Sequence, residues 1–189
     1  MLKTRFEWTI LLVVAALLGG AWIVFSQEPA TASRGPITLT EAPVVGHLAP
    51  DFTAETAVGE SVNLHQIFNE EASGQPVVLN FWASWCAPCR VEMPHFQNAS
   101  RKYNGRATIL GINQGESAQI VTNFGNEFGI TYPLLVDDEN EVNYLYTVNS
   151  LPTTIFIGAD GVVKEVLIGT ISQAVLEERI ESLIAEAIP

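Results

Sequence analysis

The sequence has 189 residues and a formal net charge of −12 at pH 7, from 21 acidic and only 9 basic side chains. This balance argues against nucleic acid and against docking on an anionic membrane surface, because no basic cluster follows Arg106. Length and composition fit one domain of about 140 residues, large enough to bury most of its unfolded surface, after an N-terminal extension.

The N-terminal extension contains an apolar run without charge at residues 8–25, with a tryptophan near each end. A helix of that length nearly spans a bilayer core of about 30 Å, and interfacial tryptophans are common at its borders. The positive flank formed by Lys3 and Arg5 is expected to stay inside. We therefore predict a cytoplasmic segment at 1–7, a transmembrane anchor at 8–25, and a cell-membrane protein whose catalytic domain lies outside the cytoplasm.

A cleaved signal peptide is the alternative interpretation of the same run. Ala30, Thr31 and Ala32 are small residues suited to cleavage, although the apolar region of a signal peptide usually has only about 7 to 15 residues. Residues 26–43 contain three prolines and no sustained periodicity, and we expect them to form a tether. The remaining residues, 44–189, are the predicted globular domain.

The globular domain begins with a predicted hairpin and a short helix. Short apolar segments between Phe52 and Leu64 flank Gly59, which favours a turn between two strands. Residues 65–71 are expected to form a short helix before the next strand.

The only two cysteines, Cys86 and Cys89, lie where a buried strand predicted at 77–82 gives way to a helix predicted at 87–103. Pro88 fits the first helical turn, which needs no amide donor, so Cys86 lies at the positive end of the helix dipole. That position lowers the pKa of a thiol below its usual value of about 8.5. Cys86 is therefore the candidate nucleophile, and Cys89 is the candidate resolving cysteine.

A structural disulfide and a zinc site are the alternatives to redox chemistry. On the chain-entropy model, a loop of about four residues stabilises a fold by only roughly 2 kcal/mol, against about 4.7 for a loop of a hundred residues. A closed zinc site generally has four ligands, whereas His47, His65 and His95 are scattered without ligand spacing. We predict no cofactor and no metal.

The rest of the chain alternates predicted strands and helices. Strands are expected at 107–112, 134–136, 153–157 and 162–168, and helices at 117–128, at 139–146 and from about 170 or 172 to the end. The strand, helix, strand order around the cysteines predicts a parallel crossover, and Asp160 with Gly161 predicts a hairpin between the last two strands. The sequence thus predicts an α/β domain.

Three segments carry a resemblance to a known family. FWASWCAPC, around the cysteines, resembles the active-site segment of thioredoxin-fold oxidoreductases. APDF at 49–52 and LPTT at 151–154 resemble, in the right order, the N-terminal signature and the cis-proline segment of the membrane-anchored TlpA and ResA group. The resemblance covers roughly residues 45–184. It implies a thioredoxin-like fold with a mixed central sheet flanked by helices, an N-terminal hairpin and a central helical insertion.

Glu92 and Asn80 are the candidate residues for proton handling. Glu92 follows Cys89 by three residues and resembles the active-site glutamate of ResA-type proteins, although spacing alone equally favours a residue that complements the helix dipole. A carboxylate beside the thiols would oppose the thiolate and could pass protons. Asn80 stands where ordinary thioredoxins carry a buried aspartate. The alternative interpretation is a strand asparagine that only satisfies local hydrogen bonds. An amide cannot titrate, which shifts proton handling toward Glu92.

The predicted substrate-binding residues are Trp85, Leu151 and Pro152. The resemblance implies a cis bond before Pro152, facing the disulfide, whereas periodicity alone favours a trans proline at a strand start. A cis X–Pro bond costs only about 0.5 to 1 kcal/mol. The backbone groups of Leu151 would then pair with a substrate peptide.

The resemblance implies an enzyme, an extracytoplasmic thiol-disulfide oxidoreductase that reduces the haem-binding cysteine pair of apocytochrome c. Its electrons would come from a transmembrane thiol donor of the CcdA type. Another TlpA-like reductive task, such as copper-site assembly, stays open. A copper-binding chaperone that is not an enzyme also stays open, although the two-residue spacing and Pro88 favour redox chemistry. A peroxidase is disfavoured, because Leu79 and Ala83 replace the proline and threonine of the Pro-x-x-x-Thr-x-x-Cys pattern.

Overall fold

The computed structural model describes four ranges of the chain: 8–10, 13–18, 40–69 and 74–187. The first two ranges are helical, and none of the helices in the described ranges has the length and apolar character needed to cross a membrane. The rest of the predicted anchor and nearly all of the predicted tether lie outside the described residues. The chain divides into two units, and the second, residues 39–189, contains the fold described below.

This unit alternates strands and helices as the hydrophobic pattern predicts. In chain order the elements are β1 (Thr53–Thr56), β2 (Ser61–Asn63), α2 (Leu64–Asn69), β3 (Val77–Trp82), α3 (Ala87–Lys102), β4 (Thr108–Gln114), α4 (Ala118–Phe128), β5 (Leu134–Asp137), α5 (Glu141–Leu145), β6 (Thr153–Ile157), β7 (Val163–Ile168) and α6 (Gln173–Ala187).

The strands form one mixed sheet of seven strands in the order β2-β1-β5-β4-β3-β6-β7. Strands β3, β4 and β5 are parallel to their neighbours in this group, and the other pairs are antiparallel. The predicted mixed sheet, N-terminal hairpin and final hairpin are therefore confirmed. Because β3 pairs with β6 up to Phe81 and Thr153, the end of β3 lies beside the start of β6.

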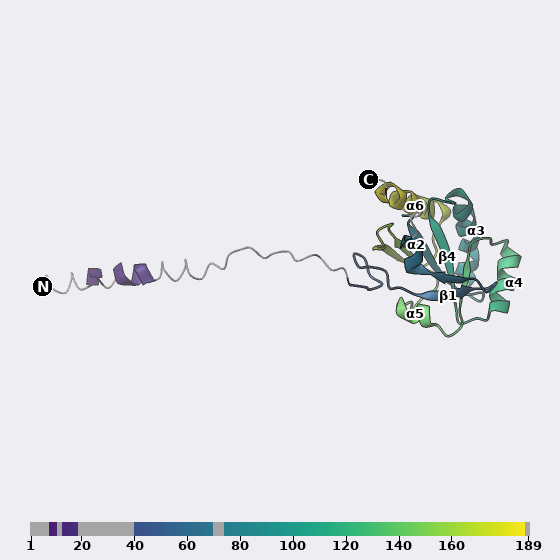
Figure 1. Cartoon of the computed structure of the whole chain (residues 1–189), viewed down its shortest axis with the longest axis horizontal. Coiled ribbons are helices and arrows are strands. Elements are labelled where there is room, and N and C mark those ends of the chain that lie inside the picture. The colour runs from purple at the N-terminus through teal and green to yellow at the C-terminus, as the bar shows by residue number, and fades with distance from the viewer. Residues whose placement is uncertain (1–7, 11–12, 19–39, 70–73, 188–189) are drawn as a thin grey trace. The chain divides into compact units, whose positions relative to one another are not determined.

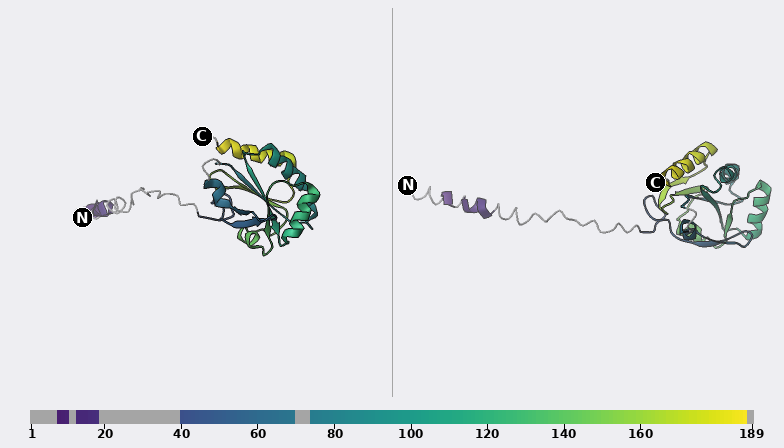
Figure 2. Two further views of the ribbon diagram at one scale, coloured as in Figure 1. Left: turned by 45° about the vertical axis from the view of Figure 1, so that its right-hand side comes forward. Right: turned by 45° about the horizontal axis from the view of Figure 1, so that its top comes forward.

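All six residues of β3 are buried, and their side chains alternate between two apolar clusters. Val78 and Trp82 belong to the cluster that contains the core residues of α3, α4 and α6. Leu79 and Phe81 belong to the cluster that contains those of α2 and α5. The sheet therefore lies between two groups of helices, as Figures 1 and 2 show. A strand covered on both faces explains the continuous apolar run in the sequence.

Two predicted helix boundaries are corrected by the structure. The helix predicted at 139–146 begins at Glu141, because Asn140 has a φ of 61° and is left-handed rather than helical. The carboxylate of Asp137 accepts hydrogen bonds from the N–H groups of Val142 and Asn143 and so fixes this later start. The helix predicted from residue 65 begins one residue earlier, and its predicted end at 71 lies outside the described residues.

The packing of β4 against β5 leaves no space for a side chain at Gly111. A Cβ atom there would lie 2.7 Å from Cδ2 of Leu134 and 3.2 Å from Nε1 of Trp82. We expect Gly111→Ala to lower the free energy of unfolding by about 1 to 3 kcal/mol through overpacking, measured by urea unfolding. Gly125→Ala is the control. Alanine in place of glycine stabilises a helix by about 1 kcal/mol, and the new Cβ at this position would meet Leu134 only at 3.2 Å, a milder contact. Equal destabilisation by both changes would contradict this explanation.

Candidate active site

The strand-to-helix connection holds Cys86 at the start of α3. The N–H of Cys86 donates to the carbonyl of Ala83 at 3.2 Å, which closes a four-residue turn after β3. Cys86 is the N-cap of α3, and its Sγ accepts a hydrogen bond from the N–H of Cys89 at 3.2 Å. The sequence-based placement of Cys86 at a helix N-terminus is confirmed. In this structure the two sulfurs form a disulfide.

A groove of about 350 Å³ opens beside Cys86. Its lining combines residues 85–88, Gln114 and residues 148–151, and none of these side chains carries a charge. Cys86 is 5 % exposed and Cys89 is fully buried, so a partner approaching through the groove meets Cys86 first. Trp85, which is 68 % exposed, presents an aromatic ring at the same place.

The Leu151–Pro152 peptide bond is cis, as the LPTT segment predicts. The loop is fixed on both sides of this bond, because the hydroxyl of Thr153 donates to the carbonyl of Ser150 and the N–H of Gly169 donates to that of Pro152, each at 2.8 Å. Within the described residues, the N–H and C=O of Leu151 make no hydrogen bond. An extended peptide in the groove would find both groups free to pair.

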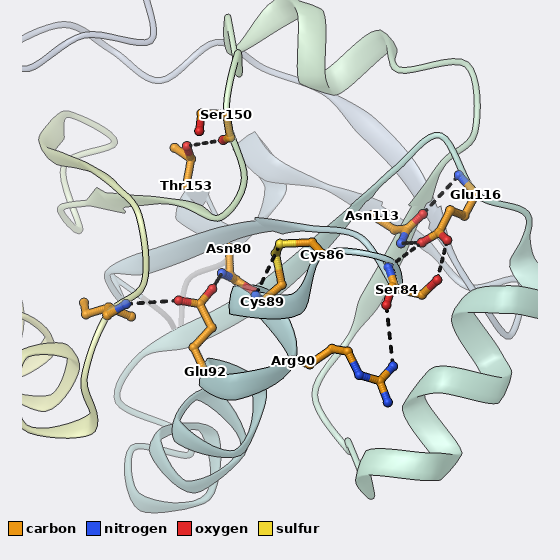
Figure 3. Close-up of a disulfide and its surroundings, with 11 residues drawn as sticks. Asn80, Ser84, Cys86, Cys89, Arg90, Glu92, Asn113, Glu116, Ser150 and Thr153 are labelled. Atoms are coloured by element: carbon orange, nitrogen blue, oxygen red, sulfur yellow. Dashed lines mark hydrogen bonds between the residues drawn. A yellow bond between two sulfur atoms is a disulfide. The ribbon is translucent and has the colours of Figure 1, made fainter.

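Glu92 is fully buried on the face of the sheet that carries the disulfide. Its Oε1 accepts a hydrogen bond from Nδ2 of Asn80 at 2.8 Å, and its Oε2 accepts one from the N–H of Ile171 at 3.1 Å. In the view of Figure 3 the Asn80 amide lies between the Glu92 carboxylate and the disulfide. Glu92 is thus part of a buried polar contact and is not a surface residue that complements the helix dipole.

The environment of Glu92 changes its acidity. Burial raises the pKa of Glu92 from 4.5 to about 7, and the hydrogen bonds from Ile171 and Asn80 limit the rise because they stabilise the carboxylate. A carboxyl group with a pKa near neutrality can accept and release a proton under physiological conditions. Asn80 donates to this carboxylate, so it has a role beyond local hydrogen bonding in its strand.

A second buried carboxylate, Glu116, lies on the other side of the active-site turn and is not among the residues predicted from the sequence. Its Oε2 accepts hydrogen bonds from the N–H of Ser84 and from Nδ2 of Asn113, both at 2.7 Å, and its Oε1 accepts one from the hydroxyl of Ser84 (Figure 3). A glutamate in a polar loop normally indicates a solvated side chain, and its partner Ser84 is 32 residues away. No local signal in the sequence connects the two.

Arg90, the residue after Cys89, binds the same turn from helix α3. Its Nη1 donates to the carbonyl of Ser84 at 3.5 Å, and its Nη2 forms an ion pair with Glu127. The guanidinium lies 5.3 Å from the ring centroid of Phe124 and 4.8 Å from that of Phe128. These are cation–π contacts, and they hold Arg90 between the active-site turn and α4.

Within the part of the chain that the structure describes, no three His, Cys, Asp or Glu side chains gather closely enough to hold a metal ion. The groups around the cysteines include the two sulfurs of a disulfide, a carboxyl of raised pKa and an uncharged groove. This arrangement suits the exchange of a disulfide with another polypeptide.

Comparison with known proteins gives consistent matches. The model of the AhpC/TSA family matches residues 45–166. The chain is 36% identical over 143 residues to the thiol-disulfide oxidoreductase ResA of Geobacillus kaustophilus, covering 75% of this chain and 79% of that protein. It is 33% identical over 139 residues to the thioredoxin-like protein YneN of Bacillus subtilis, covering 72% of this chain and 78% of that one.

Solved structures show the same likeness. StoA from Bacillus subtilis superimposes with a TM-score of 0.59 at 25% identity, covering 69% of this chain and 96% of StoA. A thiol:disulfide interchange protein of the thioredoxin family from Chlorobium tepidum superimposes with a TM-score of 0.64 at 26% identity, covering 72% and 95% of the two chains. The fold around the cysteine pair is therefore that of thioredoxin-like proteins.

The raised pKa of Glu92 predicts a pH-dependent stability. The pKa is about 7 in the folded protein and 4.5 in the unfolded chain, so the folded state binds the proton more tightly. The contribution of protonated Glu92 to the free energy of unfolding is then fully present below about pH 4.5 and is lost as the pH rises through about 7. Glutamine cannot ionise, so we expect that Glu92→Gln does not show this fall in the free energy of unfolding, which amounts to up to about 3 kcal/mol in the unchanged protein.

The measurement is urea unfolding of the oxidised protein and of Glu92→Gln between about pH 4 and 8. Other carboxylates contribute equally to both proteins, so the difference between the two pH profiles isolates Glu92. Parallel profiles would show that Glu92 ionises with an ordinary pKa.

Proposed function

This chain belongs to the AhpC/TSA family and is a thiol-disulfide oxidoreductase of the ResA and StoA type, and we propose that it works outside the cytoplasmic membrane as a reductant of apocytochrome c. The observation that carries the proposal is the buried Glu92 carboxyl beside the Cys86–Cys89 pair. The substrate follows from the resemblance to the ResA group.

The chemistry begins with both cysteines reduced. The Cys86 thiolate attacks one sulfur of the substrate disulfide, a Cys86–substrate disulfide forms, and the other substrate sulfur leaves and takes up a proton. Cys89 then loses its proton and attacks Sγ of Cys86. The second substrate sulfur leaves as a thiol, and the Cys86–Cys89 disulfide remains. Two electrons have moved from this protein to its substrate.

Two environments divide the work between the cysteines. Cys86 is the more exposed of the two cysteines, and its N-cap position favours the thiolate that attacks. Cys89 is buried and lies three residues before Glu92 on α3. The carboxylate form of Glu92 accepts the proton that Cys89 releases. The groove holds the substrate through Trp85 and through the backbone of Leu151 beside Pro152.

Glu92 also favours reducing chemistry. A carboxylate near the thiols opposes the thiolate, and this removes one source of stability from the reduced form. Strong oxidants of this fold class have the opposite property, since their reduced form is stabilised. An extracytoplasmic compartment is oxidising, so a reductant there needs a supply of electrons. We assign that supply to a transmembrane thiol donor of the CcdA type, and the N-terminal anchor would keep the domain beside it.

Trapping variants test the order of attack and the substrate together. We expect Cys89→Ser to accumulate a mixed disulfide with an oxidised Cys-x-x-Cys-His peptide of apocytochrome c, because the resolving thiol is gone. Cys86→Ser should form none, and the alkylated peptide is the control. Mass spectrometry of the adduct reads the result. Trapping by Cys86→Ser alone would reverse the assigned roles, and trapping of other oxidised proteins but not of this peptide would point to another client.

The reduction potential of the Cys86–Cys89 couple tests the direction of electron flow. A value near or below about −250 mV is expected, and Glu92→Gln should raise it because the opposing carboxylate is lost. The potential is measured by equilibration with glutathione or thioredoxin of known potential. A value near about −120 mV would make this protein a disulfide donor.

A further inference from the structure

The turn between β3 and α3 has its polar groups bound by residues outside the cysteine motif. Ser84 and Trp85 are the two central residues of the turn that the hydrogen bond from Cys86 to Ala83 closes. The next residue after them is Cys86, the more exposed of the two cysteines, and both Cys86 and Trp85 line the groove. The conformation of Ser84 therefore determines where both the sulfur and the aromatic ring lie.

Every polar group of Ser84 has a partner. Its N–H and its hydroxyl donate to the two oxygens of Glu116, and its carbonyl accepts from Arg90. Hydrogen bonds to a charged acceptor are shorter and stronger than neutral ones. Glu116 is only 9 % exposed, and Asn113 fixes it through a bond to Oε2 at 2.7 Å and a bond from the Glu116 N–H at 3.2 Å.

These partners lie directly before helix α4 or contact it. Glu116 immediately precedes the N-cap of α4, and Arg90 packs on Phe124, Glu127 and Phe128 of the same helix. The active-site turn is thereby attached to α4 from two directions. Neither contact involves a cysteine sulfur, a substrate group or the Glu92 carboxyl.

We propose that Glu116 is a positioning residue for thiol-disulfide exchange, which acts through Ser84 to hold Cys86 at the helix N-terminus and Trp85 in the groove. Without it, the turn populates other conformations, and the rate falls in proportion to the fraction of molecules that keep the competent one. This inference requires only the exchange chemistry of the Cys86–Cys89 pair and not the proposed substrate, so a failure of the apocytochrome assignment leaves it intact.

Glu116→Ala is the principal variant, and Gln97→Ala is its matched control. Gln97 is also buried and also ties α3 to the insertion, through two hydrogen bonds with Thr131 at 2.8 and 2.7 Å, one to the hydroxyl and one from the N–H. Gln97 is eight residues further along α3 than Cys89. Its substitution therefore measures the loss of stability when such a contact is removed away from the cysteines.

The measurements are kcat/KM for reduction of a small disulfide peptide, the thiol pKa of Cys86 from iodoacetamide kinetics, and the midpoint of thermal unfolding. We expect Glu116→Ala to lower kcat/KM about tenfold and to raise the Cys86 thiol pKa toward its ordinary value, because the sulfur leaves the helix N-terminus. Gln97→Ala should lower the unfolding midpoint to a similar degree and leave kcat/KM and the thiol pKa unchanged.

Further variants separate positioning from charge. Glu116→Gln keeps an acceptor oxygen for Ser84, so it should retain more activity than Glu116→Ala, and it serves as the test if Glu116→Ala does not fold. Ser84→Ala added to Glu116→Ala should cause no further loss, since the two residues act in one chain of contacts. Identical behaviour of the Glu116 and Gln97 variants, or a fall in the Cys86 thiol pKa on loss of the carboxylate, would overturn the proposal.

Discussion

The burial of β3 on both faces is the constraint on which the site depends. A strand with parallel β4 on one side and antiparallel β6 on the other cannot shift its register without exposing its apolar side chains. The last residue of β3 therefore has a fixed position at the end of the sheet where the parallel strands terminate. The cysteine turn, the start of β6 with its cis-proline loop and the end of β4 meet at this point because each of these strands pairs with β3 or continues from it.

Two buried carboxylates flank the active-site turn, and we propose different roles for them. Glu92 lies on α3 and accepts a hydrogen bond from the N–H of Ile171, and its burial brings its pKa to about 7, which suits the proton transfer that we propose for it. Glu116 belongs to the loop before α4, and its oxygens are taken up by the hydrogen bonds of Ser84 and Asn113. We assign proton handling to the first and geometry to the second.

The insertion gains a function from this arrangement. The resemblance implies that the helix predicted at 117–128 is an insertion between two strands, and its apolar face explains its presence in the core. In the structure, Glu116 in the loop that precedes α4 accepts hydrogen bonds from Ser84, and two aromatic side chains of α4 contact Arg90, which donates to the carbonyl of Ser84. A unit outside the shared strand and helix of the redox motif thus participates in the alignment of the nucleophile.

The sequence by itself determined the strand before the cysteines, the N-cap position of Cys86 and the alternation of strands and helices. These features follow from side-chain period and proline geometry, which act over a few residues. The cis bond before Pro152 is implied by the resemblance of LPTT to a family segment, whereas periodicity alone favours a trans bond. Tertiary structure decided that Glu92 binds the N–H of Ile171, 79 residues away, and that Glu116 binds Ser84. It also set the start of α5 through Asp137. Partners so distant depend on the order of strands in the sheet, which local propensity does not specify.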